Sequence, residues 1–137
     1  MPEQKTFIML KPDVLKRGLM GAIISRIEDQ DYFIERAQVM ELDKQMVAHH
    51  YAHLLNEDFY PELESYMLSG PVFAMVVTGD NVIDGMRKII GATDPRDAAP
   101  HTIRADFARN VTENAIHGSD TEENAAIEIT RFFNSYE

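Results

Sequence analysis

The sequence contains no cysteine. This absence excludes disulfide scaffolds, thiolate metal sites and cysteine nucleophiles, and it suits a reducing compartment. No apolar run approaches the length that crosses a membrane. The opening residues, MPEQKTFIMLKPD, place charge directly after a short apolar stretch, which is unlike a secretory signal peptide. Together these absences predict a cytoplasmic protein without a membrane anchor.

Several common nucleotide and hydrolase motifs are also missing. The sequence has no GxxxxGK[ST] phosphate loop and no GxGxxG fingerprint. It lacks the HRD and DFG elements of protein kinases, and it lacks a GxSxG elbow. Ser119 is therefore a poor candidate for a hydrolase nucleophile, and any phosphate chemistry must use a different arrangement of residues.

Positive charge is scarce in this chain. There are 13 Lys and Arg residues against 23 Asp and Glu residues, which gives a net charge of -10. Because nucleic-acid binding relies on Lys and Arg meeting phosphates, this balance argues against a nucleic-acid partner. If the protein handles smaller phosphate compounds, its fold must gather scattered basic residues in one place.

Apolar patterning predicts alternating strands and helices within one domain over residues 1–137, with 45% apolar residues to build a core. Asp43 and Thr121 are expected to cap helices. The segment 91–110 is predicted to be a long polar loop, which is usually a functional feature. The predicted strands cover 5–11, 32–42, 72–78 and 114–117, and the predicted helices cover 18–30, 44–55, 61–68, 80–90 and 121–133. Alternation alone favours an α/β sandwich and leaves the strand order open.

His117 is the first candidate for chemistry. It ends a short apolar segment and precedes the turn Gly118-Ser119-Asp120, which leads into the last predicted helix. Such a position combines exposure with backbone N–H groups that favour anions. Imidazole is a competent nucleophile when one ring nitrogen is unprotonated, and Glu128 is placed to hold that tautomer. A buried histidine with local hydrogen bonds is the alternative interpretation.

Two basic residues stand in apolar surroundings. Lys11 ends the first predicted strand, and Arg104 lies between apolar residues in TIRADFA. A buried lysine or arginine is unfavourable unless an anion meets it, so both residues suggest a fixed anionic partner. Surface ion pairing is the alternative for each.

A histidine cluster and two aromatic residues leave their roles open. His49 and His53 are spaced as i, i+4 metal ligands on a helix. However, no glutamate stands in the HExxH position and no third ligand is apparent, so a solvated helix face is favoured. Tyr51 and Phe59 belong either to the core or to the lining of a pocket.

Five motifs occur in order along the chain: TFIMLKPD (6–13), SGP (69–71), GATDP (91–95), TIRADFA (102–108) and NAIHGSD (114–120). Together they resemble the nucleoside diphosphate kinase family from about residue 5 to residue 133, and NxxHGSD is the most specific of them. The resemblance implies an α/β (α+β) sandwich of the ferredoxin-like type, with a four-stranded antiparallel sheet covered by helices. It replaces the parallel sheet that alternation suggests.

The resemblance also implies a reaction. A nucleoside triphosphate, mainly ATP, would give its γ-phosphate to Nδ1 of His117, and a nucleoside diphosphate would then take it in a ping-pong cycle. Glu128 would orient the imidazole through the other ring nitrogen, with Ser119 as a hydrogen-bond partner. Mg²⁺ would travel on the nucleotide phosphates instead of in a protein cage.

For the other positions that match the family's motifs, the resemblance implies roles in nucleotide binding. The residues implied to contact phosphates are Lys11, Tyr51, Arg87, Thr93 and Arg104. Asn114 and Lys11 would reach the ribose hydroxyl and neighbouring oxygens. Phe59 and Val111 would sandwich the base without edge-specific hydrogen bonds, which predicts broad use of bases and sugars.

The chain departs from the family pattern in the long loop. His101 and Ala105 stand where glycines are usual, and glycine tolerates backbone angles that other residues do not. Since this loop helps subunits meet in the family, the departures bear on assembly. The short C-terminal end resembles the short bacterial form, for which a dimer is the minimum, a tetramer is favoured and a hexamer is possible.

Two other classes of function compete with the enzyme. A ferredoxin-like module that holds a nucleotide without turnover is opposed by the intact set of His117, Lys11, Arg104 and Glu128. A nucleic-acid-binding module is opposed by the net charge of -10 and by the lack of an aromatic RNA-binding strand motif.

Overall fold

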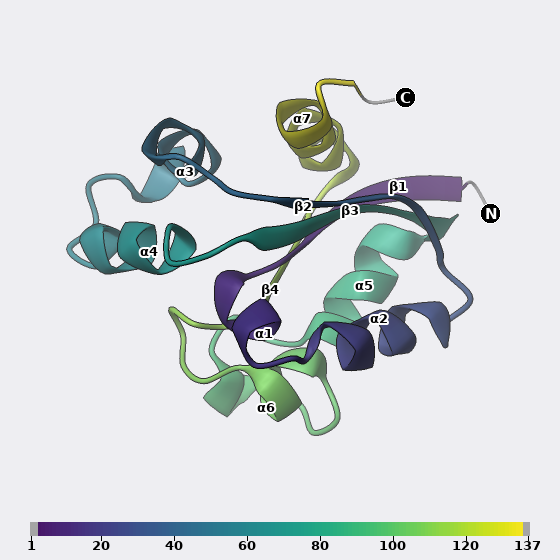
Figure 1. Cartoon of the computed structure of the whole chain (residues 1–137). Coiled ribbons are helices and arrows are strands. Elements are labelled where there is room, and N and C mark those ends of the chain that lie inside the picture. The colour runs from purple at the N-terminus through teal and green to yellow at the C-terminus, as the bar shows by residue number, and fades with distance from the viewer. Residues whose placement is uncertain (1–2, 136–137) are drawn as a thin grey trace.

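A computed structural model describes residues 3–135 as an antiparallel sheet with helices on both faces (Figure 1). The four strands are β1 (Glu3–Leu10), β2 (Phe33–Met40), β3 (Val72–Asp80) and β4 (Ile116–Gly118). Their order in the sheet is β2-β3-β1-β4, and every pairing is antiparallel. The expected ferredoxin-like sheet is therefore confirmed. The prediction of one domain over 1–137 extends at both ends beyond the described residues.

The helices connect these strands and follow them. They are α1 (Pro12–Lys16), α2 (Met20–Glu28), α3 (Lys44–His50), α4 (Tyr60–Met67), α5 (Val82–Ile90), α6 (Ile103–Phe107) and α7 (Glu122–Phe133), with short 3₁₀ turns η1 (Ala52–Leu54) and η2 (Pro95–Asp97). Both expected caps are confirmed, because the side chains of Asp43 and Thr121 accept backbone hydrogen bonds from the first turns of α3 and α7. Within residues 3–135, no helix is long and apolar enough to span a membrane.

The two faces of the sheet carry separate cores. Phe7 and Met9 of β1 face one side and Ile8 and Leu10 face the other, and all four are fully buried. The helices α3, α4 and α7 cover the face of Phe7 and Met9, whereas α2 and α5 cover the opposite face (Figure 1). Burial on both faces explains why β1 is a continuous apolar run in the sequence.

Some sequence-based boundaries are wrong. The strand predicted over 114–117 is β4 at Ile116–Gly118, because Ala115 has a positive φ of 74° and does not continue the strand. The helix predicted over 44–55 ends at His50, because Tyr51 leaves the helical region with φ of -109° and ψ of 31°. The predicted loop 91–110 contains η2 and the five-residue helix α6, whose N-cap is Thr102. Helices this short are stabilised by caps and tertiary contacts and show too little periodicity to detect. His101 adopts a left-handed φ of 73° just before this cap, where the family usually has glycine.

The strand β4 places the candidate histidine. His117 is opposite Met9 in the register with β1, so its side chain lies on the face that α7 covers. The next residue, Gly118, points to the opposite face, where an added Cβ would lie 2.7 Å from Cδ1 of Ile90. The close packing of α5 against β4 therefore requires glycine directly after the histidine.

Candidate active site

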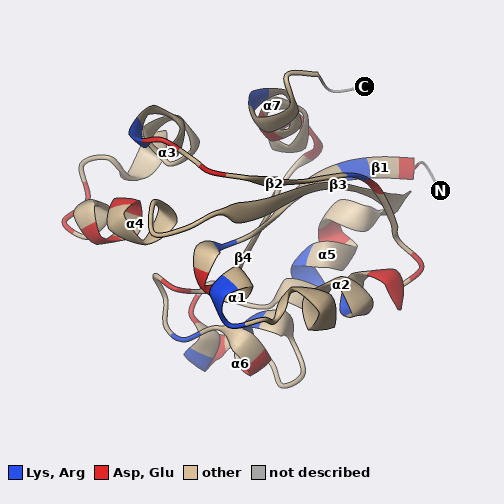
Figure 2. Cartoon of the chain, in the orientation of Figure 1, with Lys and Arg blue, Asp and Glu red and all other residues tan. Residues whose placement is uncertain are grey.

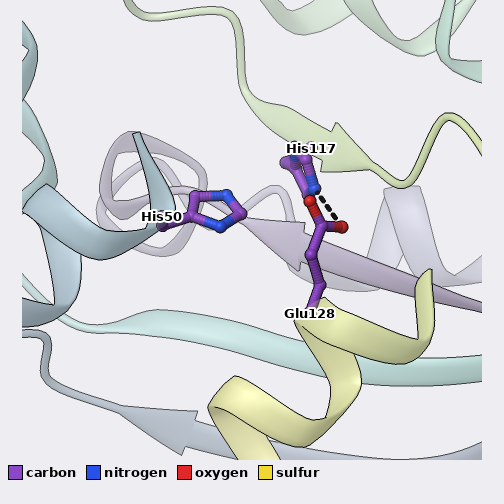
Figure 3. Close-up of side chains that lie close together, drawn as sticks. All are labelled: His50, His117 and Glu128. Carbon is purple, nitrogen blue, oxygen red and sulfur yellow. Dashed lines mark hydrogen bonds and ion pairs between the residues drawn. The ribbon is translucent and has the colours of Figure 1, made fainter. Parts of the chain in front are cut away.

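His117 is held by a carboxylate that comes from α7. Its Nε2 lies 2.9 Å from Oε1 of Glu128, and both side chains are partly buried (Figure 3). The buried Ser119 donates from Oγ to the same Oε1 over 2.6 Å. Ser119 is itself held against β1, because its Oγ accepts a hydrogen bond from the backbone N–H of Phe7. The three residues that the sequence grouped are thus in contact.

This contact determines which ring nitrogen of His117 is available. An ionised carboxylate can only accept, so Nε2 carries the proton in the neutral ring and Nδ1 keeps its lone pair. The tautomer of a histidine is usually fixed in this way, by the hydrogen bond that one ring nitrogen makes. The geometry therefore leaves Nδ1 as the nucleophilic atom.

A strained turn precedes His117. Ala115 has a positive φ of 74°, and the N–H of Ile116 donates to the carbonyl of Asn114 over 2.9 Å, which closes a three-residue γ-turn. The backbone N–H of Lys11 donates to the carbonyl of Ala115 over 2.8 Å. Such strain persists only where the surroundings hold it, and it is concentrated at functional sites.

Arg104 holds the same turn from the other side. Its guanidinium donates to the carbonyl oxygens of Gly91, Asn114 and Ile116, the last over 2.6 Å. Lys11 donates from Nζ to Oδ1 of Asn114 over 2.6 Å. Within residues 3–135, neither cation forms an ion pair with a carboxylate. Both positive charges are thus oriented by neutral oxygens and are uncompensated by an ion pair, although Asp13, which is paired with Arg17, attracts Lys11 at longer range.

Burial perturbs the acidity of these two cations. Lys11 is 5% exposed, and burial, reinforced by Arg104 and opposed in part by Asp13, lowers the pKa of its ammonium to about 7. Burial likewise lowers the pKa of Arg104 to about 10, with Arg87 as a further cause. Without a ligand, Lys11 is therefore close to losing its proton at neutral pH. A bound anion would favour the protonated form and raise this pKa again.

A cleft of about 1390 Å³ joins these groups. Of the residues predicted from the sequence, it is lined by Lys11, Tyr51, Phe59, Arg87, Thr93, Arg104, Val111, Asn114, His117 and Glu128. Ser119 stands behind this lining. Phe59 and Val111 are large apolar side chains that remain 44% and 51% exposed. Figure 2 shows Lys and Arg on α5 and on the segment around α6. The basic residues in the cleft lining are Lys11, Arg87, Lys88, Arg104 and Arg131, so the fold gathers positive charge in an acidic chain.

The histidine cluster of α3 separates in the structure. His49 and His53 are exposed, and His53 belongs to η1, so the i, i+4 pair on one helix face is not formed. His50 is buried, and its ring centroid lies 4.6 Å from that of His117. Among the described residues, the set whose ligand atoms lie close enough for a metal ion is His50, His117 and Glu128. Sequence reasoning did not place His50 at the site.

Arg131 is a second residue that sequence reasoning missed. It lines the cleft and donates from Nη1 to Nδ1 of His50 over 3.1 Å. A signal existed, because Arg131 follows Glu128 by three residues on α7 and so shares its helix face. Its partner, however, is 81 residues away along the chain.

These features define a class of protein: a ferredoxin-like sandwich with a carboxylate-oriented histidine that faces a cation-lined cleft suited to phosphates. A family model described as nucleoside diphosphate kinase matches residues 4–137. A nucleoside diphosphate kinase of Lawsonia intracellularis is 42% identical over 98% of this chain and 97% of its own. One from Thermus thermophilus is 45% identical over 95% of each chain.

Solved structures agree with this assignment. A halophilic nucleoside diphosphate kinase from Halobacterium salinarum in complex with CDP has a TM-score of 0.94 and 40% identity, covering 98% of this chain and 90% of that chain. The apo enzyme from Encephalitozoon cuniculi has a TM-score of 0.91 and 39% identity, covering 94% and 88%. The chain belongs to the nucleoside diphosphate kinase family, whose enzymes bind nucleotides and use a divalent cation.

The uncompensated charge of Lys11 yields a prediction. In the variant Lys11→Met, the ligand-free protein should unfold at higher urea concentration at pH 7, with a gain of about 1–2 kcal/mol, because a buried ammonium is replaced by an apolar side chain. The pKa of Lys11 in the folded protein is below its value of 10.5 in the unfolded chain. Its destabilising effect is therefore complete below pH 7 and disappears as the pH rises towards 10.5.

The advantage of Lys11→Met should consequently shrink between pH 7 and pH 10, while phosphotransfer falls by about 100-fold or more. The matched control is Lys16→Met, an exposed lysine on α1, which should change stability by less than ~0.5 kcal/mol. A Lys11→Met protein that is less stable than wild type at pH 7 would contradict this account of the site.

Proposed function

We propose that this protein is a nucleoside diphosphate kinase that works through a phosphohistidine on His117. The observation that carries the proposal is the position of Nδ1 of His117, which keeps its lone pair in a cleft that also contains the uncompensated charges of Lys11 and Arg104. A bound polyphosphate would supply the anion that these cations lack. The same arrangement favours an enzyme over a module that only binds nucleotides, since binding alone does not need an oriented nucleophile.

In the first half-reaction, Nδ1 attacks the γ-phosphorus of a nucleoside triphosphate. The N–P bond forms as the bond from the γ-phosphorus to the bridging oxygen breaks, and the nucleoside diphosphate leaves with that electron pair. The proton on Nε2 stays in its hydrogen bond to Glu128, so the carboxylate stabilises the positive charge that the ring gains. In the second half-reaction a different nucleoside diphosphate attacks the phosphoryl group, and the neutral imidazole is restored.

The other cleft residues fit roles in positioning. Phosphoryl transfer proceeds through a loose, metaphosphate-like transition state that depends on alignment and charge stabilisation. We assign contacts with the phosphates to Lys11, Tyr51, Arg87, Thr93 and Arg104. Asn114 is assigned to the ribose and neighbouring oxygens, and it is already fixed by Lys11 and by a bond from its Nδ2 to the carbonyl of Thr93. The exposed Phe59 and Val111 are assigned to the base.

We propose Mg²⁺ as the divalent cation. The residues fit an ion carried by the nucleotide, because the available protein ligand set of His50, His117 and Glu128 contains two imidazoles, whereas Mg²⁺ prefers oxygen ligands. Bound to the phosphates, Mg²⁺ would neutralise part of their charge. Lys11 and Arg104 would then act on the oxygens that remain free.

The proposal extends to assembly and compartment. The edge strand β2 exposes Phe33 to 67% and Val39 to 52%, and unpaired edges with apolar side chains favour association. This supports a homo-oligomer, a dimer at least; a tetramer or a hexamer would need a further interface between dimers. We propose that residues 1–137 act as one domain in the cytoplasm, where nucleoside triphosphates are made and used.

The test of the proposed function is label transfer from γ-labelled ATP with Mg²⁺. Wild-type protein should acquire acid-labile label that GDP or CDP removes, and His117→Ala should acquire none, because the attacking nitrogen is lost. Chelation of the cation should suppress labelling of the wild type. Equal labelling of the variant would mean that another residue is the nucleophile, and a wild-type protein that binds ATP without labelling would be a binding module.

A second prediction concerns the base. Apolar and aromatic contact with a base face does not read its edges, so kcat/KM should be similar for purine, pyrimidine and deoxy substrates. Steady-state kinetics with ADP, GDP, CDP and their deoxy forms measure this directly. A preference above ~100-fold, or about 2.7 kcal/mol, would require an edge-specific contact and would contradict the assignment of Phe59 and Val111.

A further inference from the structure

His50 has a defined tautomer in this structure. Its Nδ1 lies 3.1 Å from Nη1 of Arg131. A guanidinium can only donate hydrogen bonds, so Nδ1 of His50 must accept and the proton of the neutral ring must be on Nε2. Arg131 thus fixes a second imidazole at the site, in the way that Glu128 fixes His117.

The fixed ring of His50 lies against the nucleophile. Its plane is inclined at 80° to that of His117, with centroids 4.6 Å apart, and Figure 3 shows His50 pointing towards the pair of His117 and Glu128. Tyr51 and Phe132 enclose it at centroid distances of 4.7 Å and 5.2 Å. His50 therefore has little freedom to rotate away from His117.

Glu128 is the group for which the two histidines can compete. Its Oε1 already accepts hydrogen bonds from His117 and Ser119, and a ligand nitrogen of His50 lies within 4.8 Å of the ligand atoms of His117 and Glu128. If His50 were protonated, its imidazolium would be a rival ion partner for this carboxylate. The hydrogen bond that orients His117 would then be weakened.

The charges around His50 oppose its protonation. Burial contributes most to lowering the pKa of His50 well below its usual range. The groups that lower it further are His117 on β4, Arg131 on α7, Lys11 at the end of β1 and His53 in η1. The same positive surroundings disfavour a metal ion at His50, His117 and Glu128, and Arg131 already occupies Nδ1 of His50.

We propose that Arg131 is a positioning residue: by donating to Nδ1 of His50 it keeps that imidazole uncharged, so that Glu128 remains paired with His117. Arg131 need not touch the substrate for this effect. The structural part of the proposal concerns the tautomer and charge of His50, and its kinetic consequence rests on the proposed function.

The structural part is tested on wild-type protein by ¹⁵N NMR of the histidine side chains between pH 5 and pH 8. His50, identified from its absence in His50→Gln, should show the Nε2–H tautomer and remain neutral throughout. In Arg131→Met, protonation of His50 should begin at a higher pH than in wild type, because one positive neighbour and one hydrogen bond to the neutral form are lost. A wild-type His50 that carries its proton on Nδ1, or titrates near 6.5, would overturn the proposal.

The kinetic part is tested by the pH dependence of kcat/KM. The kcat/KM of Arg131→Met relative to wild type should be highest at pH 8 and should fall as the pH is lowered, so that the midpoint of its acid-side decline lies at a higher pH. Arg131→Lys keeps the charge and should shift the midpoint less. The double variant His50→Gln/Arg131→Met should lose the additional acid sensitivity, since the titrating ring is gone. Lys44→Met removes an exposed charge from α3 and should leave the profile unchanged.

The possible outcomes separate the proposal from the function on which it rests. A loss in Arg131→Met that is equal at all pH values would indicate a merely structural role and would overturn the proposal, as would an unshifted midpoint. If wild-type protein shows no phosphotransfer at all, the proposed function fails while the NMR measurement still decides the state of His50. Circular dichroism of each variant establishes that it is folded before the rates are compared.

Discussion

The structure depends on two cations, the buried Lys11 and the half-buried Arg104, which form no ion pair with a carboxylate among residues 3–135. Lys11 and Arg104 are oriented by Asn114 and by backbone carbonyl oxygens, which satisfy their hydrogen bonds without neutralising them. Such an arrangement is unfavourable in an isolated protein, and it is retained in a chain whose net charge is -10. The polyphosphate that the site is proposed to bind completes this arrangement, so part of the stability of the folded site is supplied by its ligand.

The ferredoxin-like sheet makes this arrangement possible through its central strands. β1 ends at Leu10, directly before Lys11, and β4 sets His117 opposite Met9 in the register of the two strands. The helix α7, packed on the same face, brings Glu128 to His117 and Arg131 to His50. One helix thus fixes the tautomers of two neighbouring imidazoles, and the strained turn at Ala115 is held between Lys11 and Arg104. Nucleophile, orienting carboxylate and cations are therefore parts of one packed unit.

The sequence was sufficient for the three long strands, the two helix caps and the family, because apolar runs, capping residues and NxxHGSD are local signals. It placed the last strand at 114–117, whereas β4 is Ile116–Gly118. It was insufficient for α6 and for the end of α3 at His50, since short helices depend on tertiary contacts more than on periodicity. It brought together most of the cleft but missed the contact of His50 with Arg131. No local pattern encodes a hydrogen bond between residues so far apart along the chain.

In the proposed function, the phosphates of the nucleotide are the anionic partner that stabilises the charged form of Lys11. The most direct test of this role is calorimetry of GDP binding at pH 8 in buffers of different ionisation enthalpy. Because the pKa of Lys11 is about 7 without ligand and phosphate must raise it, binding should take up about one proton at pH 8 and almost none at pH 6. Binding at pH 8 without proton uptake would show that Lys11 does not meet the phosphates and would contradict the account.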